Sequence, residues 1–205
     1  MIQMMAWLSV GFGFGVVVVR RRSVAILLVG CQSAAIGMAA VSLSPGRSQE
    51  FFTAAAVLIV KAAVLSVLLG AAVLRTREQT RIRSGVNPLM RMALTLVAIL
   101  AVNLLLPSMP GINPDVQRAS IALLCIGGAV FIFRRATILQ LVGVLIAENG
   151  LALAAISVAG GIPAVIELGA LFDVTLVISV AIAFHDRIYL LLGSGDSSLL
   201  TELRD

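Results

Sequence analysis

Three ionisable residues lie deep inside apolar stretches of the sequence. Lys61 sits within AAAVLIVKAAVLSVLL, Glu148 within LVGVLIAENGLALAA and Asp173 within LGALFDVTLVISVAIAF. Each is about eleven residues from one end of its stretch, which predicts a position near the middle of a membrane at the 1.5 Å rise of a helix. An ion at that depth costs roughly 2.5–3.5 kcal/mol on insertion scales. These side chains therefore need a partner, water or the loss of their charge.

Two interpretations of these charges are open. In the first, Lys61, Glu148 and Asp173 form a proton relay, because groups at equal depth can exchange protons sideways through trapped water. In the second, the lysine and one acid form a buried ion pair that only fixes helix packing.

Three further polar residues are auxiliary candidates. Gln32 can hydrogen-bond between helices or join the relay, and packing is the simpler interpretation. Asn149 directly follows the first buried acid and is placed to orient it. Glu167 precedes the second buried acid by six residues and points about 240° away from it around a helix. We therefore expect Glu167 to be a rim or entry residue.

The composition excludes an ordinary soluble domain. Of the 205 residues, 60% are hydrophobic and only 12% are charged, whereas soluble domains are roughly half apolar and a quarter charged. A chain of this size cannot hide so much apolar surface in one compact core, but lipid removes the problem. The single His185 and the separated Cys31 and Cys125 argue against a metal site in this chain. The charges cluster between apolar stretches, which argues against nucleic acid as a partner.

The apolar stretches predict an all-α integral membrane protein with about seven transmembrane helices in a single domain, residues 1–205. Turn residues such as Asn87-Pro88 and the run from Pro107 to Pro114 separate the stretches. Helices are expected throughout, because the bilayer interior cannot satisfy free backbone groups. The expected helices are residues 2–19, 24–44, 51–74, 88–107, 118–133, 137–159 and 163–184, followed by a cytoplasmic tail at 185–205.

Arginine placement predicts the orientation, because cytoplasmic loops carry the excess of positive residues. One side has only Arg47 and Arg118 in its loops. The loops and tail of the other side hold Arg20, Arg21, Arg22, Arg75, Arg77, Arg81, Arg83, Arg134, Arg135, Arg187 and Arg204. The arginine-rich side is therefore predicted to be cytoplasmic, and an odd number of helices then places the N-terminus outside and the C-terminus inside.

A possible internal repeat bears on the architecture. Arg21–Gly30 reads RRSVAILLVG and Arg134–Gly143 reads RRATILQLVG, at an offset of 113 residues. Apolar sequence matches itself easily, but the expected helices 1–3 and 5–7 would also run in the same directions. The pattern suggests two parallel three-helix units joined by a linking helix.

Several stretches in order along the chain resemble a known family. They are GCQSAA at Gly30–Ala35, Lys61 with its apolar flanks, AENG at Ala147–Gly150, IELGALFD at Ile166–Asp173 and SLLTEL at Ser198–Leu203. Together they resemble the membrane subunit called component E of hydrogenase-4, a relative of the small subunit K of respiratory complex I. Each stretch is short, but their order and spacing span nearly the whole chain.

The resemblance implies a role for the buried charges. In subunit K, two neighbouring helices each carry a buried carboxylate on a proton path. Glu148 matches the first carboxylate, and Asp173 matches the second with a shorter side chain. Lys61 matches component E only. The resemblance thus implies a non-catalytic membrane-arm subunit of a group 4 nickel–iron hydrogenase that contributes to proton translocation, so the chain is not expected to be an enzyme by itself.

The resemblance also implies the surroundings of the chain. Its partners would be membrane lipid, antiporter-like and quinone-subunit-like membrane subunits, and a cytoplasmic hydrogenase arm. The nickel–iron centre and the iron–sulfur clusters would lie in those partners, with no cofactor in this chain. The expected location is a bacterial or archaeal plasma membrane. Two alternatives are a subunit of a multi-subunit cation/proton antiporter and a membrane assembly scaffold that conducts nothing.

Overall fold

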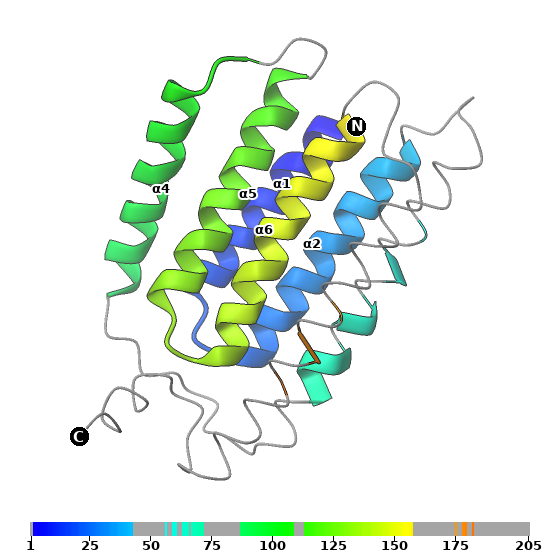
Figure 1. Ribbon diagram of the computed structural model, residues 1–205, viewed down its shortest axis with the longest axis vertical. Helices are drawn as coiled ribbons and strands as arrows, with labels where there is room; N and C mark the ends of the chain where they lie inside the picture. The colour runs from blue at the N-terminus through cyan, green and yellow to red at the C-terminus, as the bar shows by residue number, and fades with distance from the viewer. Residues whose placement is uncertain are drawn as a thin grey trace.

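The computed structural model describes three continuous parts of the chain, residues 2–42, 87–108 and 113–157. It also describes short pieces between residues 56 and 71, and residues 175, 178, 179 and 182. The regular elements of these parts are helices: α1 (Ile2–Val18), α2 (Arg22–Ser42), α4 (Pro88–Leu105), α5 (Pro114–Phe133) and α6 (Thr137–Ser157) (Figure 1).

These helices have the length and composition of a multi-pass membrane protein. Four of them, α2, α4, α5 and α6, contain spans of 18 to 20 residues that are long and apolar enough on average to cross a membrane, and α1 is a shorter apolar helix of 17 residues. Twenty residues at 1.5 Å each match the hydrocarbon thickness of a bilayer. The all-helical membrane fold predicted from the sequence is therefore confirmed at this level.

The described helices form two hairpins that lie side by side. The α1–α2 hairpin turns at residues 19–21, and the α5–α6 hairpin turns at residues 134–136. Both turns lie at the same end of the bundle, α1 packs against α5, and α2 packs against α6 (Figure 1). Equivalent helices thus run in the same direction, as the repeat requires. The third helix of each expected unit lies mostly outside the described residues, so the three-helix repeat stays a prediction.

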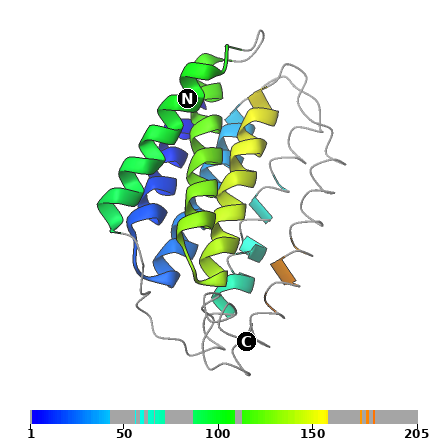
Figure 2. The ribbon, with the colours of Figure 1, turned by 60° about the vertical axis from the view of Figure 1, so that its left-hand side comes forward.

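Helix α4 is attached to the outside of this pair of hairpins. It packs against α5 and α1 at the edge of the described bundle (Figure 2). Only Arg91 and Thr95 are buried among its residues. Large apolar side chains such as Leu104 and Val97 face outward. Such a face is stable against lipid but not against water.

Glycines allow α5 and α6 to approach closely. A Cβ atom at Gly127 would lie 2.6 Å from both the backbone nitrogen of Ala147 and the backbone oxygen of Gly143. A Cβ atom at Gly143 would lie 2.8 Å from the backbone oxygen of Gly127. Small residues at such positions let two helix backbones come into contact, which is a common source of stability between membrane helices.

Asparagine–proline pairs set where two of the helices begin. Asn87 accepts a hydrogen bond from the backbone of Leu89 at 3.1 Å, and Asn113 accepts one from Asp115 at 3.0 Å. In each case the proline that follows needs no partner in the first helical turn. Because of this cap, α5 begins at Pro114 rather than at the expected residue 118. The starts of the other four helices differ from expectation by two residues or fewer.

Candidate functional site

A buried cluster of polar side chains joins three helices in the middle of the bundle. Asn149 of α6 donates from Nδ2 to Oε1 of Gln32 at 3.0 Å and to Oγ of Ser33 at 2.9 Å, both in α2. The Ser33 hydroxyl lies 3.1 Å from Oδ1 of Asn149, as a donor to it. Gln32 in turn donates from Nε2 to the backbone oxygen of Ser9 in α1 at 2.9 Å. All four residues are at most 5% exposed.

The cluster lies at mid-depth. Gln32 has ten residues of α2 on either side, which is about 15 Å of helix in each direction. At that depth an unsatisfied polar group costs several kcal/mol, so side-chain amides must find partners on neighbouring helices. Gly13 of α1 makes room for this contact, because a Cβ atom there would lie 3.2 Å from Nε2 of Gln32.

Glu148 lies next to this cluster along α6. It precedes Asn149 directly, is half-buried, and has a buried Oε2 atom. Successive residues of a helix point about 100° apart, so the carboxylate emerges beside the amide network rather than within it. The structure thus brings Glu148, Asn149 and Gln32 into one region. Lys61, Glu167 and Asp173 lie outside the described residues, and their place relative to this region stays a prediction.

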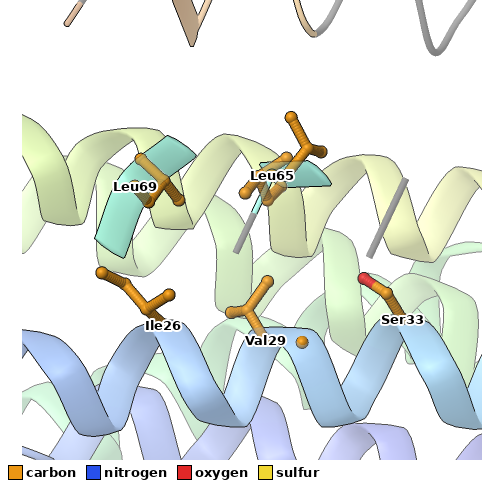
Figure 3. Close-up of a pocket in the computed structure, with 7 residues that line it drawn as sticks. Ile26, Val29, Ser33, Leu65 and Leu69 are labelled. Carbon is orange, nitrogen blue, oxygen red and sulfur yellow. The ribbon is translucent and has the colours of Figure 1, made fainter. Parts of the chain in front are cut away.

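A small cavity lies beside the cluster. Its volume is about 10 Å³, and it is lined by Ile26, Val29, Gly30, Ser33, Leu65, Leu69 and Leu145. In Figure 3, Ile26, Val29 and Ser33 project from α2 toward Leu65 and Leu69. The volume is close to the minimum that holds one water molecule. Among the described residues of the lining, Ser33 supplies the only polar side chain, and Leu65 follows Lys61 by four residues along the chain.

A second polar region lies at the end of the bundle where both hairpins turn. Arg134, only 2% exposed, donates from Nη2 to the backbone oxygens of Val16 at 3.1 Å and Val17 at 3.0 Å, and also to that of Val19. These are carbonyl groups that the end of α1 leaves without helical partners. Burial lowers the pKa of Arg134 to about 10, so its guanidinium is still protonated at neutral pH.

Two further arginines lie close to Arg134. The positive charges of Arg91 and Arg20 add to the lowering of its pKa. Arg91 is 1% exposed and lies in the first turns of α4. The sequence does not single out this residue, because it falls just inside the expected helix 88–107 and so is not one of the loop arginines that predict the orientation. The available signal was its position three residues after Pro88, which places it in the first turns of the helix that Asn87 caps.

Comparison with known proteins gives one informative relative. The chain is 32% identical over 155 residues to Rv0085, an uncharacterized protein of Mycobacterium tuberculosis, and the match covers 73% of this chain and 70% of that protein. The chain belongs to the Rv0085 family. No known family profile matches it, and no solved structure gives a significant match.

The chemistry open to this member of the Rv0085 family follows from its side chains. Amides and hydroxyls do not gain or lose protons near neutral pH, so the Gln32, Ser33 and Asn149 cluster can position groups but cannot store a proton. Glu148 is the titratable group beside it among the described residues. Within those residues, no three His, Cys, Asp or Glu side chains come together as metal ligands.

Proposed function

We propose that this chain is a non-catalytic membrane-arm subunit of a group 4 nickel–iron hydrogenase related to complex I, and that it helps to move protons across the membrane. The observation that supports the proposal is a carboxylate at mid-depth, Glu148, beside a buried network that joins three helices. The likeness of the AENG stretch at Ala147–Gly150 to component E supplies the functional context. The proposal extends to the fold: seven spans, the N-terminus outside, the C-terminus inside, and a prokaryotic plasma membrane.

Each residue has a distinct role in this proposal. Glu148 takes up and releases protons. Asn149, held by Gln32 and Ser33, keeps α6 in a fixed rotation so that the carboxylate faces the proton path. Lys61 and Asp173 continue the path on other helices, and Glu167 lies at its rim. The cavity at Ser33 lies on the side of α2 that faces Leu65, which follows Lys61 by four residues along the chain.

The hydrogenase chemistry belongs to other subunits in this proposal. The nickel–iron centre and iron–sulfur clusters would be held by a cytoplasmic arm, and antiporter-like and quinone-subunit-like subunits would flank this chain in the membrane. This chain would then couple to electron transfer only through protons and helix packing. Purification of the tagged chain from native membranes under mild detergent should recover nickel and iron together with the partner subunits.

A charge-removing variant tests the relay. Replacing Glu148→Gln keeps the shape and hydrogen bonding of the side chain but removes its ability to exchange protons. We expect normal assembly and normal hydrogen evolution with an artificial electron donor, but at least about a tenfold loss of proton pumping in vesicles, or about 1.4 kcal/mol in the limiting step. Asp115→Asn is the matched control, because Asp115 lies at the start of α5 and outside the middle of the membrane. Full pumping by an assembled Glu148→Gln complex would refute the relay.

The antiporter alternative has a different readout. A subunit of a cation/proton antiporter would purify without nickel or a hydrogenase arm. Its vesicles would show proton movement that depends on sodium or potassium rather than on hydrogen. Either result would replace the hydrogenase proposal. If Glu148→Gln then reduced cation/proton exchange, the relay role of the carboxylate would still hold.

The hydrogen bonds of the polar cluster favour a second candidate, a scaffold that conducts nothing. Gln32, Ser33 and Asn149 satisfy one another and the α1 backbone, as expected of groups that only hold helices together. In a scaffold, Lys61 and Asp173 would form a structural pair, and replacing both with leucine would be tolerated. In a relay, the double variant would assemble but lose proton pumping.

A further inference from the structure

The contact between α4 and the rest of the bundle includes a buried charge. Arg91 and Thr95, one helical turn apart, are the buried residues of α4. The Thr95 hydroxyl donates to the backbone oxygen of Arg91 at 2.7 Å, so this threonine is satisfied within its own helix. The guanidinium of Arg91 is therefore the polar group that α4 brings into the interface.

This guanidinium has no acceptor within the part of the chain that the structure describes. The Nε, Nη1 and Nη2 atoms of Arg91 are all buried without a hydrogen-bond partner, and so is Nη1 of Arg134. Its charged neighbours Arg134 and Arg20 are also positive. The N-terminal end of α4 adds a further partial positive charge. Burying an uncompensated ion costs several kcal/mol, so this arrangement requires an anion from beyond the described residues.

The surroundings point to the kind of anion. Leu89 and Met90, directly before Arg91, are 70% and 60% exposed, so the first turn of α4 presents apolar side chains outward beside the buried charge. Arg20, on the turn between α1 and α2, is exposed at the same end of the bundle. An arginine-rich end with an adjacent apolar surface matches a lipid, with its headgroup on the guanidinium groups and its acyl chains on the leucine and methionine.

We propose that the phosphate of an anionic lipid headgroup binds between Arg91 of α4 and Arg134 of the α5–α6 turn, with Arg20 at the rim. A phosphate accepts hydrogen bonds from a guanidinium in a bidentate manner, which suits arginine better than lysine. Basic pockets between membrane helices commonly hold such headgroups on the cytoplasmic side. The bound lipid would join α4 to both hairpins. This proposal does not depend on the hydrogenase assignment.

Thermal unfolding of the purified full chain in neutral detergent tests the site. After removal of native lipid, we expect phosphatidylglycerol to raise the unfolding midpoint by about 5 °C and phosphatidylcholine to leave it nearly unchanged. Native mass spectrometry should show one retained phosphatidylglycerol per chain. Equal effects of the two lipids would overturn the proposal. An equal effect of inorganic phosphate alone would show a free anion site instead of a lipid site.

Matched variants identify the residues. Arg91→Gln should lose the phosphatidylglycerol shift, whereas Arg21→Gln, which removes an exposed charge at the same end, should keep it. If Arg91→Gln fails to fold, Arg91→Lys keeps the charge without the planar fork and should retain at most part of the shift. The proposal would be overturned if Arg91→Lys kept the full shift of the unfolding midpoint and native mass spectrometry showed no lipid retained by the wild-type chain. If only co-purified acidic membrane proteins stabilised the chain, the proposal would be overturned, and the anion beside Arg91 would be a carboxylate of a partner protein.

Discussion

Asn149 joins α6 to α2 through side-chain hydrogen bonds to Gln32 and Ser33. Its Nδ2 atom donates to two residues of α2, and its Oδ1 atom accepts from one of them. In hydrocarbon no water is present to hydrogen-bond with these groups, so the side chains that they pair with fix the rotation of both helices. The side chain that follows Glu148 therefore determines which way that carboxylate faces.

Replacing Asn149→Leu should destabilise the fold. The variant keeps the volume but leaves the Gln32 oxygen and the Ser33 hydroxyl buried without their partner, which costs about 1–3 kcal/mol. The measurement is the free energy of unfolding in a detergent titration. Asn103→Leu is the matched control, because within the described part of the chain Asn103 donates only to the backbone of Ile99 in its own helix, α4. An equal loss in both variants would contradict the role of the interhelical bonds.

The residue types of the cluster could be predicted, but their pairing could not. Polar residues inside apolar stretches, such as Gln32 and Asn149, are conspicuous in the sequence. Nothing local shows that two side chains 117 residues apart would meet, because that depends on which helices pack together. For Arg91, the sequence did not predict even that the residue is buried. A charge near the end of an apolar stretch is usually an interfacial anchor rather than a buried group.

Helix ends were predictable to the extent that they depend on local chemistry. The asparagine–proline pair at Asn87 marks the start of α4 as expected. The start of α5 was placed too late, because the polar residues Asp115, Gln117 and Arg118 lower the hydropathy of its first turns. The structure shows that these residues are helical, with Gln117 donating to the backbone oxygen of Pro107 at 2.9 Å. Hydropathy detects the membrane-embedded part of a helix, whereas the cap sets its actual start.

The close approach of α5 and α6 leads to a second prediction. Gly127→Ala should destabilise the hairpin by about 1–3 kcal/mol, because the added methyl would meet backbone atoms at 2.6 Å that cannot move aside. Gly128→Ala is the matched control, since no heavy atom lies within 4 Å of the site and alanine favours a helix. Thermal unfolding in detergent should separate the two. A neutral Gly127→Ala would mean that the helices can shift apart at little cost.

The two ends of the whole bundle differ in charge. The end at the hairpin turns holds Arg20, Arg21, Arg22, Arg91, Arg134 and Arg135 among the described residues. At the opposite end, Gln3 of α1 donates to Asp115 of α5 at 3.0 Å, and Arg118 lies 3.8 Å from the same carboxylate. Five of these arginines, all except Arg91, are among those that the sequence assigns to one side, and the arginine-rich end is expected to face the cytoplasm.

Cysteine labelling in intact cells tests this orientation. With Cys31→Ser and Cys125→Ala as the background, Arg118→Cys should react with a membrane-impermeant maleimide, because the Arg118 side chain is 62% exposed at the arginine-poor end. Arg135→Cys, exposed at the arginine-rich end, should react only after the cells are permeabilised. Arg118→Cys increases the arginine excess of the arginine-rich end by one and Arg135→Cys decreases it by one, so most of the charge bias remains in both variants. The reverse pattern would show that the arginine-rich end faces outward, and Arg134 and Arg91 would then lie in the outer leaflet.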